Sequence, residues 1–212
     1  AVGYEALTAN TSGSQNTGLG HRSLISNTTG SSLTAAGVGA LTYNTTGTQN
    51  SAFGRNALNA NTTGSHNSAL GHNALGANTT ANNNTAIGNA ALGANTTGES
   101  NVGVGASALS AVTTGNDNTA VGNWSLQLNT TGTRNTSVGR ASGATNTTSS
   151  DNTSLGYHAL HTNTANDNTA IGSKALFANT TGTQNVGVGG SALISNTTGN
   201  YNTAVGMWAL ED

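Results

Sequence analysis

Apolar and polar residues follow one another with a fixed period of 17 along the whole chain. The unit reads G-x-x-A-L-x-x-N-T-T-G-x-x-N-T-A and ends on Val, Ile or Leu before the next glycine. Eleven of the twelve intervals between these marker glycines are 17 residues long, and one, from Gly156 to Gly172, is 16. A fixed period of this size indicates a repeat architecture in which every unit forms the same structural layer.

The pattern within one unit predicts short strands joined by tight turns. Residues 84–88, 118–122 and 202–206 each combine Asn-Thr-Ala with an aliphatic residue and glycine, and each is expected to be a strand. The Asn-Thr-Thr-Gly segments, such as residues 61–64, are typical of turns, because Asn and Gly tolerate positive φ. Gly, Asn and Thr are also poor helix formers. We therefore expect each unit to be one coil with two short strands and two corners.

Stacked coils of this kind predict an all-β fold, a parallel β-solenoid (β-roll) of about twelve 17-residue coils. Neighbouring coils would lie ~4.8 Å apart, which gives a rod on the order of 60 Å long. Equivalent asparagines would then form two ladders, since stacked amides can hydrogen-bond along the axis. The first ladder includes Asn44, Asn61 and Asn78, and the second includes Asn84, Asn101 and Asn118.

The array runs through residues 1–212 without a linker and predicts a single elongated domain. Neither end resembles the polar cap that a solenoid needs, so we expect a fragment of a longer array. The weakest coil is expected at residues 139–156, where Gly143 replaces the usual leucine and Ser149 replaces the corner glycine. The missing residue in 156–172 lies between Asn163 and Asn168, which indicates an exposed corner.

Side chains on a strand alternate between its two faces. A small residue, such as Ala86 or Gly103, precedes each aliphatic residue, which favours a narrow coil interior with the aliphatic column pointing outward. An exposed aliphatic stripe of that length favours self-association, as a homotrimer or a filament. The alternative places the aliphatic residues inside a flat monomeric solenoid. The expected oligomer interface consists of Leu70, Ile87, Val104, Val121, Val138, Val188 and Val205.

Composition narrows the classes of partner. The chain is 6% charged with a net charge of −2, so it lacks the basic field that recruits nucleic acid. It has no cysteine, which excludes disulfides and thiolate metal sites. No apolar run is long enough to span a bilayer, so no membrane insertion is expected. These features suit an extracellular product at a cell surface or on a virion.

No catalytic or metal constellation is predicted, and no cofactor is expected. Asp151 and Asp167 occupy adjacent corners, where we interpret them as solvated charges and not as an acid–base pair. His158 and His161 are close in sequence, but a metal site would need further ligands. The Gly-Val-Gly segment at residues 103–105 recurs with the coil and is not followed by a helix, so it is not a nucleotide loop.

Aromatic residues fall at the variable positions of the unit. Rings there would offer apolar area and a polar handle for contacts with a surface polysaccharide. The candidates for glycan contact are Tyr4, Tyr43, Trp124, Tyr157 and Trp208.

The segments 118–122 and 168–172, the second followed by Ala175 and Leu176, resemble the head repeats of trimeric autotransporter adhesins. They are also similar to the Asn-Thr-Thr-Gly arrays of phage tail-fibre-like and bacterial fibre proteins. The resemblance covers the whole chain, although the period is longer than in the adhesin heads. It implies a parallel β-roll, three chains around one axis, and attachment to a surface.

The sequence thus favours a non-enzymatic structural and adhesive fibre segment. Two alternatives stay open: an ice-binding solenoid that uses the threonine pairs of the corners, such as Thr62 and Thr63, and a self-assembling extracellular filament. An enzyme that cleaves surface polysaccharide with paired carboxylates is the least favoured hypothesis.

Overall fold

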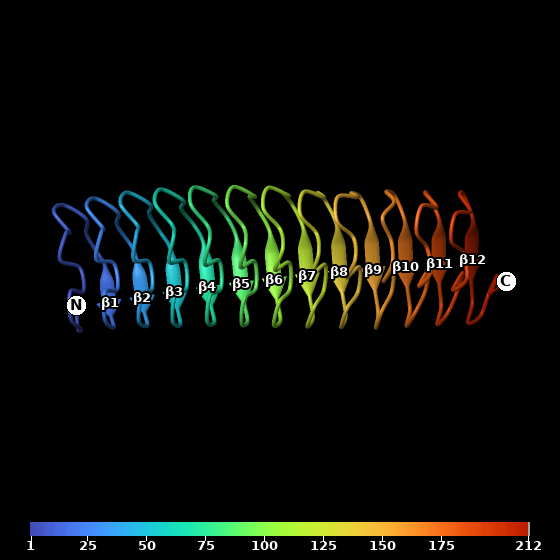
Figure 1. Cartoon of the computed structure of the whole chain (residues 1–212), viewed down its shortest axis with the longest axis horizontal. Helices are drawn as coiled ribbons and strands as arrows, with labels where there is room; N and C mark the ends of the chain where they lie inside the picture. Colours follow the sequence, from blue (N-terminus) through green and yellow to red (C-terminus); the bar gives the residue numbers. More distant parts are fainter. Residues whose placement is uncertain (212) are drawn as a thin grey trace.

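The computed structural model describes residues 1–211 and consists of stacked coils that form one straight rod (Figure 1). The prediction of an all-β parallel β-solenoid is confirmed, because twelve parallel strands form a single sheet in chain order. Each strand pairs with its neighbours in register, so that Thr119, for example, lies between Val102 and Thr136. The strands are β1 (Thr17–Leu19), β2 (Thr34–Ala36), β3 (Ser51–Phe53), β4 (Ser68–Leu70), β5 (Thr85–Ile87), β6 (Val102–Val104), β7 (Thr119–Val121), β8 (Thr136–Val138), β9 (Thr153–Leu155), β10 (Thr169–Ile171), β11 (Val186–Val188) and β12 (Thr203–Val205).

Each coil contains one strand, so the expectation of two strands per coil is wrong. The segment after the marker glycine carries positive φ at alternate residues, at Trp124 (62°) and Leu126 (47°) in one coil, and a β-strand cannot hold such values. The backbone still bonds both neighbouring coils. The Trp124 N–H donates to Ala106 O of the preceding coil, and the Leu126 N–H donates to Ser142 O of the following coil.

The coil interior is narrow and filled by small residues and one leucine. The strand contributes its middle residue, such as Ala86, and the segment after the turn contributes an alanine and a leucine, such as Ala91 and Leu92. All three side chains are fully buried. The leucine reaches the interior from its left-handed backbone conformation, φ 52° at Leu92, which costs energy that burial of the side chain offsets.

Two buried columns of asparagine fill the end of the interior near the Asn-Thr-Thr-Gly corner. In the first, Asn61 Nδ2 donates to Asn44 Oδ1 at 2.8 Å and to Gly64 O at 2.9 Å. In the second, Asn84 Oδ1 accepts the Asn101 N–H at 2.9 Å. Asn61 therefore links two coils and closes its own corner, while Asn84 links its coil to the next, and these bonds satisfy buried polar groups that would otherwise be costly. Val112 interrupts the first column, and the buried amide of Asn129 beyond it has no hydrogen-bond partner within residues 1–211.

The marker glycines are required by close approach of the backbone. Gly88 has a φ of 136°, and a Cβ added there would lie 2.5 Å from the carbonyl oxygen of Gly105 in the next coil. No L side chain fits that space or favours that conformation. The recurring glycine therefore sets how closely consecutive coils can stack.

Candidate functional site

The outer face of the sheet presents two columns of side chains along the rod. The first residue of each strand is Thr, Ser or Val, and the third is aliphatic or Phe in every strand. The middle residue of every strand is buried, so the first and third side chains point outward. The aliphatic column thus lies on the outside of the chain, as the small-residue pattern predicts.

The predicted interface residues all belong to this aliphatic column. Leu70, Ile87 and Val205 are 52%, 41% and 72% exposed. Val104, Val121, Val138 and Val188 are half-buried against their neighbours in the column. Between the larger side chains of β3 to β5 the face contains a shallow hollow of about 210 Å³, lined by Phe53, Leu70 and Ile87. A continuous apolar column of this kind marks an interaction surface.

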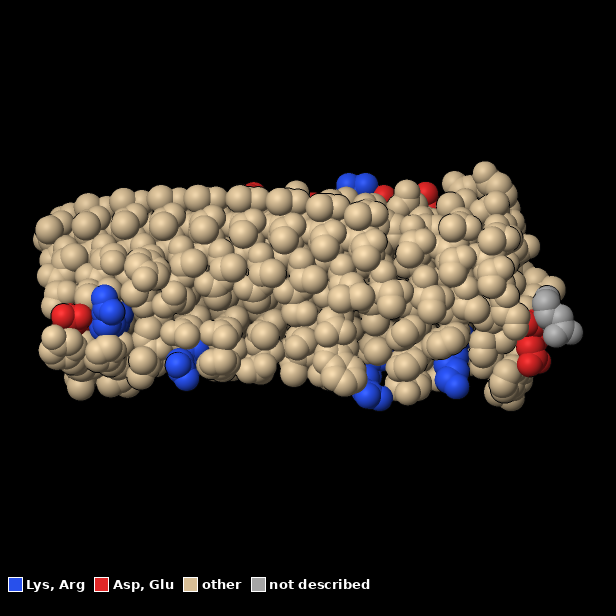
Figure 2. Space-filling view, in the orientation of Figure 1, with Lys and Arg blue, Asp and Glu red and all other residues tan. Residues whose placement is uncertain are grey.

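Most charged side chains separate onto two opposite edges of the rod, although Glu5 pairs with Arg22 at 3.3 Å on the basic edge. Lys and Arg gather along one edge in Figure 2, which is the edge that follows each marker glycine. Its basic residues are Arg22, Arg55, Arg140 and Lys174. Glu99, Asp117, Asp151 and Asp167 all lie at the other edge, in the corner before the second asparagine ladder. The net charge is small although one edge of the rod is mainly basic and the other mainly acidic.

Arg134 is the one basic residue of the acidic corner. Its guanidinium makes a two-pronged ion pair with Asp151 of the next coil, at 2.7 and 2.8 Å. Hydrogen bonding to Arg134 holds the pKa of Asp151 below its ordinary value, so this carboxylate stays ionised. Because both groups are exposed, the pair contributes little stability.

Two of the five aromatic candidates for glycan contact come together. The Arg140 guanidinium lies 5.1 Å from the centre of the Trp124 ring and 5.9 Å from that of Tyr157. Tyr4 lies elsewhere, stacked on His21 at 5.5 Å. Tyr43 and Trp208 are exposed in coils distant from this group.

Further rings extend the group around Tyr157. His158 stacks on Tyr157 with ring centres 4.0 Å apart, and His161 stacks on His158 at 4.6 Å. Phe177 of the next coil stacks on His161 at 5.3 Å. We call this group the aromatic edge, and it consists of Trp124, Arg140, Tyr157, His158, His161, Lys174 and Phe177.

Sequence reasoning missed Arg140 and Phe177 as partners in this group. The signal was available, because Arg140 and Tyr157 are 17 residues apart and therefore occupy the same position in consecutive coils. Comparing variable positions column by column would have placed the guanidinium beside the ring. The contact with Trp124 could not be found in this way, since it joins different positions of the unit.

The two histidines of the aromatic edge have pKa values below the ordinary value. Burial is the main cause for both, and for His158 the nearby His161, Arg140 and Lys174 add to it. The Nδ1 atom of His161 is buried and has no hydrogen-bond partner within residues 1–211. Both rings are therefore neutral at neutral pH, and a second positive charge there would be repelled.

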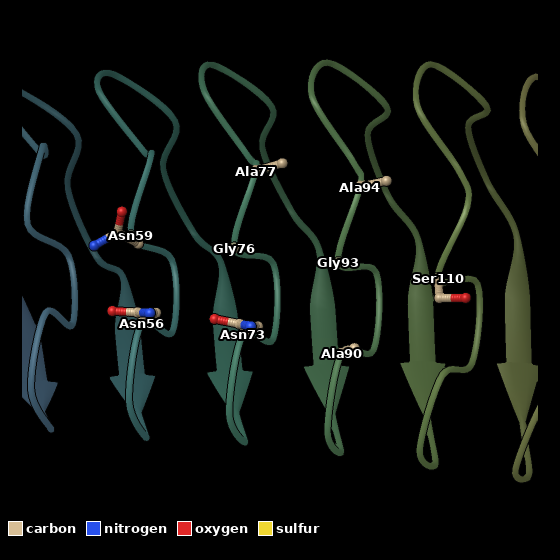
Figure 3. Close-up of a pocket in the computed structure, with 9 residues that line it drawn as sticks. All are labelled: Asn56, Asn59, Asn73, Gly76, Ala77, Ala90, Gly93, Ala94 and Ser110. Atoms are coloured by element: carbon tan, nitrogen blue, oxygen red, sulfur yellow. The ribbon is translucent and has the colours of Figure 1, made fainter.

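A shallow groove of about 460 Å³ crosses four coils on the side of the rod away from the sheet (Figure 3). It exists because Gly76 and Gly93 occupy a column that holds His161 and Phe177 farther along the chain. Asn56 and Asn73 point across one wall. The groove carries no charged residue in its lining, so we assign it no chemistry.

Within residues 1–211, no three His, Asp, Glu or Cys side chains come close enough together to hold a metal ion. Over the same range, no helix has the length and apolar character needed to cross a membrane. Comparison of the chain with protein-family models, with curated proteins and with solved structures finds no match to any of them.

Proposed function

We propose that this chain is a non-enzymatic structural and adhesive segment of an extracellular fibre, in which copies of the chain pack through the outer sheet face. The observation that carries the proposal is the outward aliphatic column from Leu19 in β1 to Val205 in β12. A soluble monomer rarely exposes a contiguous apolar patch of this length. Covering it with the same column of another copy removes apolar surface from water on both chains.

The coil stack suits a load-bearing rod. Successive strands are in register along the rod, and backbone and asparagine hydrogen bonds join each coil to the next. A threonine column adds a further link, since Thr45 Oγ1 donates to Thr62 O at 3.0 Å. Such a rod would hold a binding surface away from its anchor, and its repeated surface would allow many weak contacts at once.

We take the homotrimer implied by the resemblance as the specific form of this assembly. Light scattering on a size-exclusion column should give a mass about three times the 20.8 kDa of one chain. Large, heterogeneous masses would replace the trimer with a self-assembling filament. A monomeric mass would contradict the proposal.

A pair of variants tests whether the aliphatic column is the contact. Ile87→Lys places a charge in the column at an exposed position, so the chain should still fold but lose its oligomeric mass. The matched control is Ala106→Lys, which adds the same charge at an exposed position after the marker glycine and should keep the mass. Circular dichroism checks that both variants fold. Equal masses for both variants would place the contact elsewhere.

Ice binding is the second candidate function. The candidate ice-binding surface is the outer face of the sheet and not the threonine corners. The corner threonines of one column use their hydroxyls to bond the next coil, as Thr62 Oγ1 does to Thr79 O at 3.0 Å. The sheet face instead carries outward hydroxyls beside aliphatic groups, for example Thr85 beside Ile87 and Thr119 beside Val121. Thermal hysteresis at micromolar protein, together with a monomeric mass, would favour this candidate over the fibre.

We infer no hydrolytic activity. A glycoside hydrolase needs one carboxylic acid that stays protonated, with a raised pKa, beside a second carboxylate. In the best pair of adjacent carboxylates, Asp151 and Asp167, Asp151 does not meet the requirement for the acid, because Arg134 lowers its pKa. Release of reducing sugar from a capsular polysaccharide would contradict the inference.

A further inference from the structure

The aromatic edge departs from the repeat, because it brings stacked rings and basic side chains together on the surface of the rod. Its side chains come from four consecutive coils, with Trp124 at one end and Lys174 and Phe177 at the other. At ~4.8 Å per coil, the group extends over roughly 15 Å, which is the length of a few sugar residues and not of a single ion. The regular coils between Phe53 and Val121 carry no comparable cluster of rings within the described residues.

The Arg140 guanidinium is positioned by aromatic rings and makes no ion pair within residues 1–211. Its guanidinium lies against two rings, whose faces attract its positive charge through cation–π interactions. Within residues 1–211, both ion pairs of the chain involve other arginines, Arg22 and Arg134, and no hydrogen bond engages the Arg140 side chain. Its donors are therefore free to take a carboxylate in the two-pronged geometry that guanidinium favours.

The charges around Arg140 select an anion. Lys174 lies two coils farther along the same edge, while Asp117, Asp151 and Asp167 lie in the corner before the second asparagine ladder. Figure 2 shows most Lys and Arg along one edge of the rod and acidic side chains at the opposite edge. The flanking rings of Trp124 and Tyr157 are 40% and 43% exposed and offer apolar area beside the charge. A partner that fits has anionic groups repeated along a chain and apolar C–H faces between them.

We propose that the aromatic edge binds a carboxylate-bearing polysaccharide, with the Arg140 guanidinium as the group that receives one of its carboxylates. Lys174 attracts a second carboxylate farther along the sugar chain, and the exposed parts of Trp124 and Tyr157 contact the sugar rings between them. The inference rests on the adhesive function proposed above and names the chemistry of its ligand.

The test uses the whole chain and isothermal titration with polygalacturonate, a carboxylated sugar polymer. Neutral dextran of similar length and polyglutamate are the control ligands. Arg140→Ala should weaken binding of polygalacturonate about tenfold or more, because the charge-assisted bonds are lost. The matched control is Arg55→Ala, since Arg55 occupies the same position in its unit but has no ring stacked on it; its binding should match the wild type.

Three outcomes would overturn the inference. They are no binding of polygalacturonate, equally tight binding of polyglutamate, and an equal loss in Arg55→Ala. The mass of each sample, measured by light scattering, separates this test from that of the fibre. If the chain keeps its oligomeric mass but does not bind polygalacturonate, the ligand proposal is wrong and the fibre proposal is unaffected.

Discussion

The coils between Leu41 and Leu126 and the coil at residues 139–156 share one backbone but differ in their interior. In the regular coils a fully buried leucine recurs every 17 residues, and the apolar core is continuous from Leu24 to Leu126. In the coil at 139–156, Gly143 takes the leucine position. A second apolar cluster begins only at Ala159.

Serine replaces alanine around this interruption. Ser137, Ser142 and Ser154 are buried and hydrogen-bond to one another, where the regular coils bring alanines together. The bonds between coils nevertheless continue across it, since the Gly143 N–H donates to Ala159 O at 2.9 Å. Backbone and amide hydrogen bonds therefore set the register of the stack, while the apolar core mainly adds stability.

The largest effect should come from a change that breaks the register in either region. Gly88→Ala in a regular coil and Gly139→Ala in the interrupted one place a Cβ 2.5 Å from a carbonyl oxygen of the next coil, at φ values of 136° and 132°. Each should lower the free energy of unfolding by about 2–6 kcal/mol, from backbone strain and steric overlap. Urea denaturation followed by circular dichroism measures both.

The matched control for these glycines is Gly190→Ala. Its added Cβ would meet only Met207 Cγ, at 3.8 Å, and its φ is not in the left-handed range. Stability should stay close to that of the wild type. A loss at Gly190 as large as at Gly88 would mean that the close approach between coils is not what the marker glycine provides.

The asparagine ladder should matter more in the regular coils. Asn84 Nδ2 donates to Gly98 O of the next coil at 2.9 Å, and its Oδ1 accepts the Asn101 N–H. Asn84→Ala would leave the buried Asn101 N–H unsatisfied and would remove one of the two amide donors to Gly98 O, the other being Asn95 Nδ2, so it should cost about 2–4 kcal/mol. Asn152 Oδ1 likewise accepts the Asn168 N–H at 3.0 Å, but its Nδ2 donates to Ser150 O in its own corner and to no carbonyl of the next coil, so Asn152→Ala should cost less, about 1–3 kcal/mol. The shift of the urea midpoint measures both losses. Equal shifts for Asn84→Ala and Asn152→Ala would contradict the expected difference between the two regions.

A repair of the interior tests the comparison in the opposite direction. Gly143→Leu combined with Ser137→Ala and Ser154→Ala restores the regular pattern and should raise the free energy of unfolding by about 1–3 kcal/mol. Gly143→Leu alone should gain less, because its Cβ would lie 2.8 Å from Ser137 Oγ and 3.0 Å from Leu126 Cδ2. Thermal unfolding compares the two. A triple variant no more stable than the single one would show that the serines are not the obstacle.

Much of the fold could be predicted from the period alone. A spacing of 17 places Asn44 beside Asn61 and Val104 beside Val121 once the unit is one coil, so the stack and the outward column follow from the sequence. The missing second strand could not be predicted, because the Ala-Leu pair looks like an extended apolar run. Only the backbone shows that the leucine sits at positive φ, a conformation that is rare for this residue.

The aromatic edge was harder to predict than the column, for a related reason. The period fixes which equivalent residues stack on one another. Contacts between different positions of the unit depend on the direction in which each turn orients its side chains. His158 and His161 lie three residues apart and stack at 4.6 Å because of the local turn, which no spacing rule gives. A functional surface of a solenoid is therefore easiest to predict where it consists of equivalent positions stacked along the axis.

The smallest expected effect is a dependence on pH confined to the interrupted coil and the coil that follows it, residues 139–172. The pKa values of His158 and His161 are lowered in the folded chain, so the folded state binds fewer protons than the unfolded state as pH falls through the ordinary histidine value of 6.5. Stability is thus greatest above that value and decreases below it. The regular coils contain no stacked histidine pair among residues 37–122.

Hydrogen exchange measured at pH 7.5 and at pH 5, after correction for the intrinsic rate, should show the larger loss of protection in residues 139–172. His158→Phe with His161→Phe should remove the pH dependence, since apolar rings keep the stacking without a titratable group. His72→Phe, in a regular coil, is the matched control and should leave it unchanged. Equal loss of protection along the whole rod would mean that acid acts on the assembly and not on this pair. A loss confined to 139–172 would show that protonation of this histidine pair, and not of the assembly, destabilises this part of the rod at low pH.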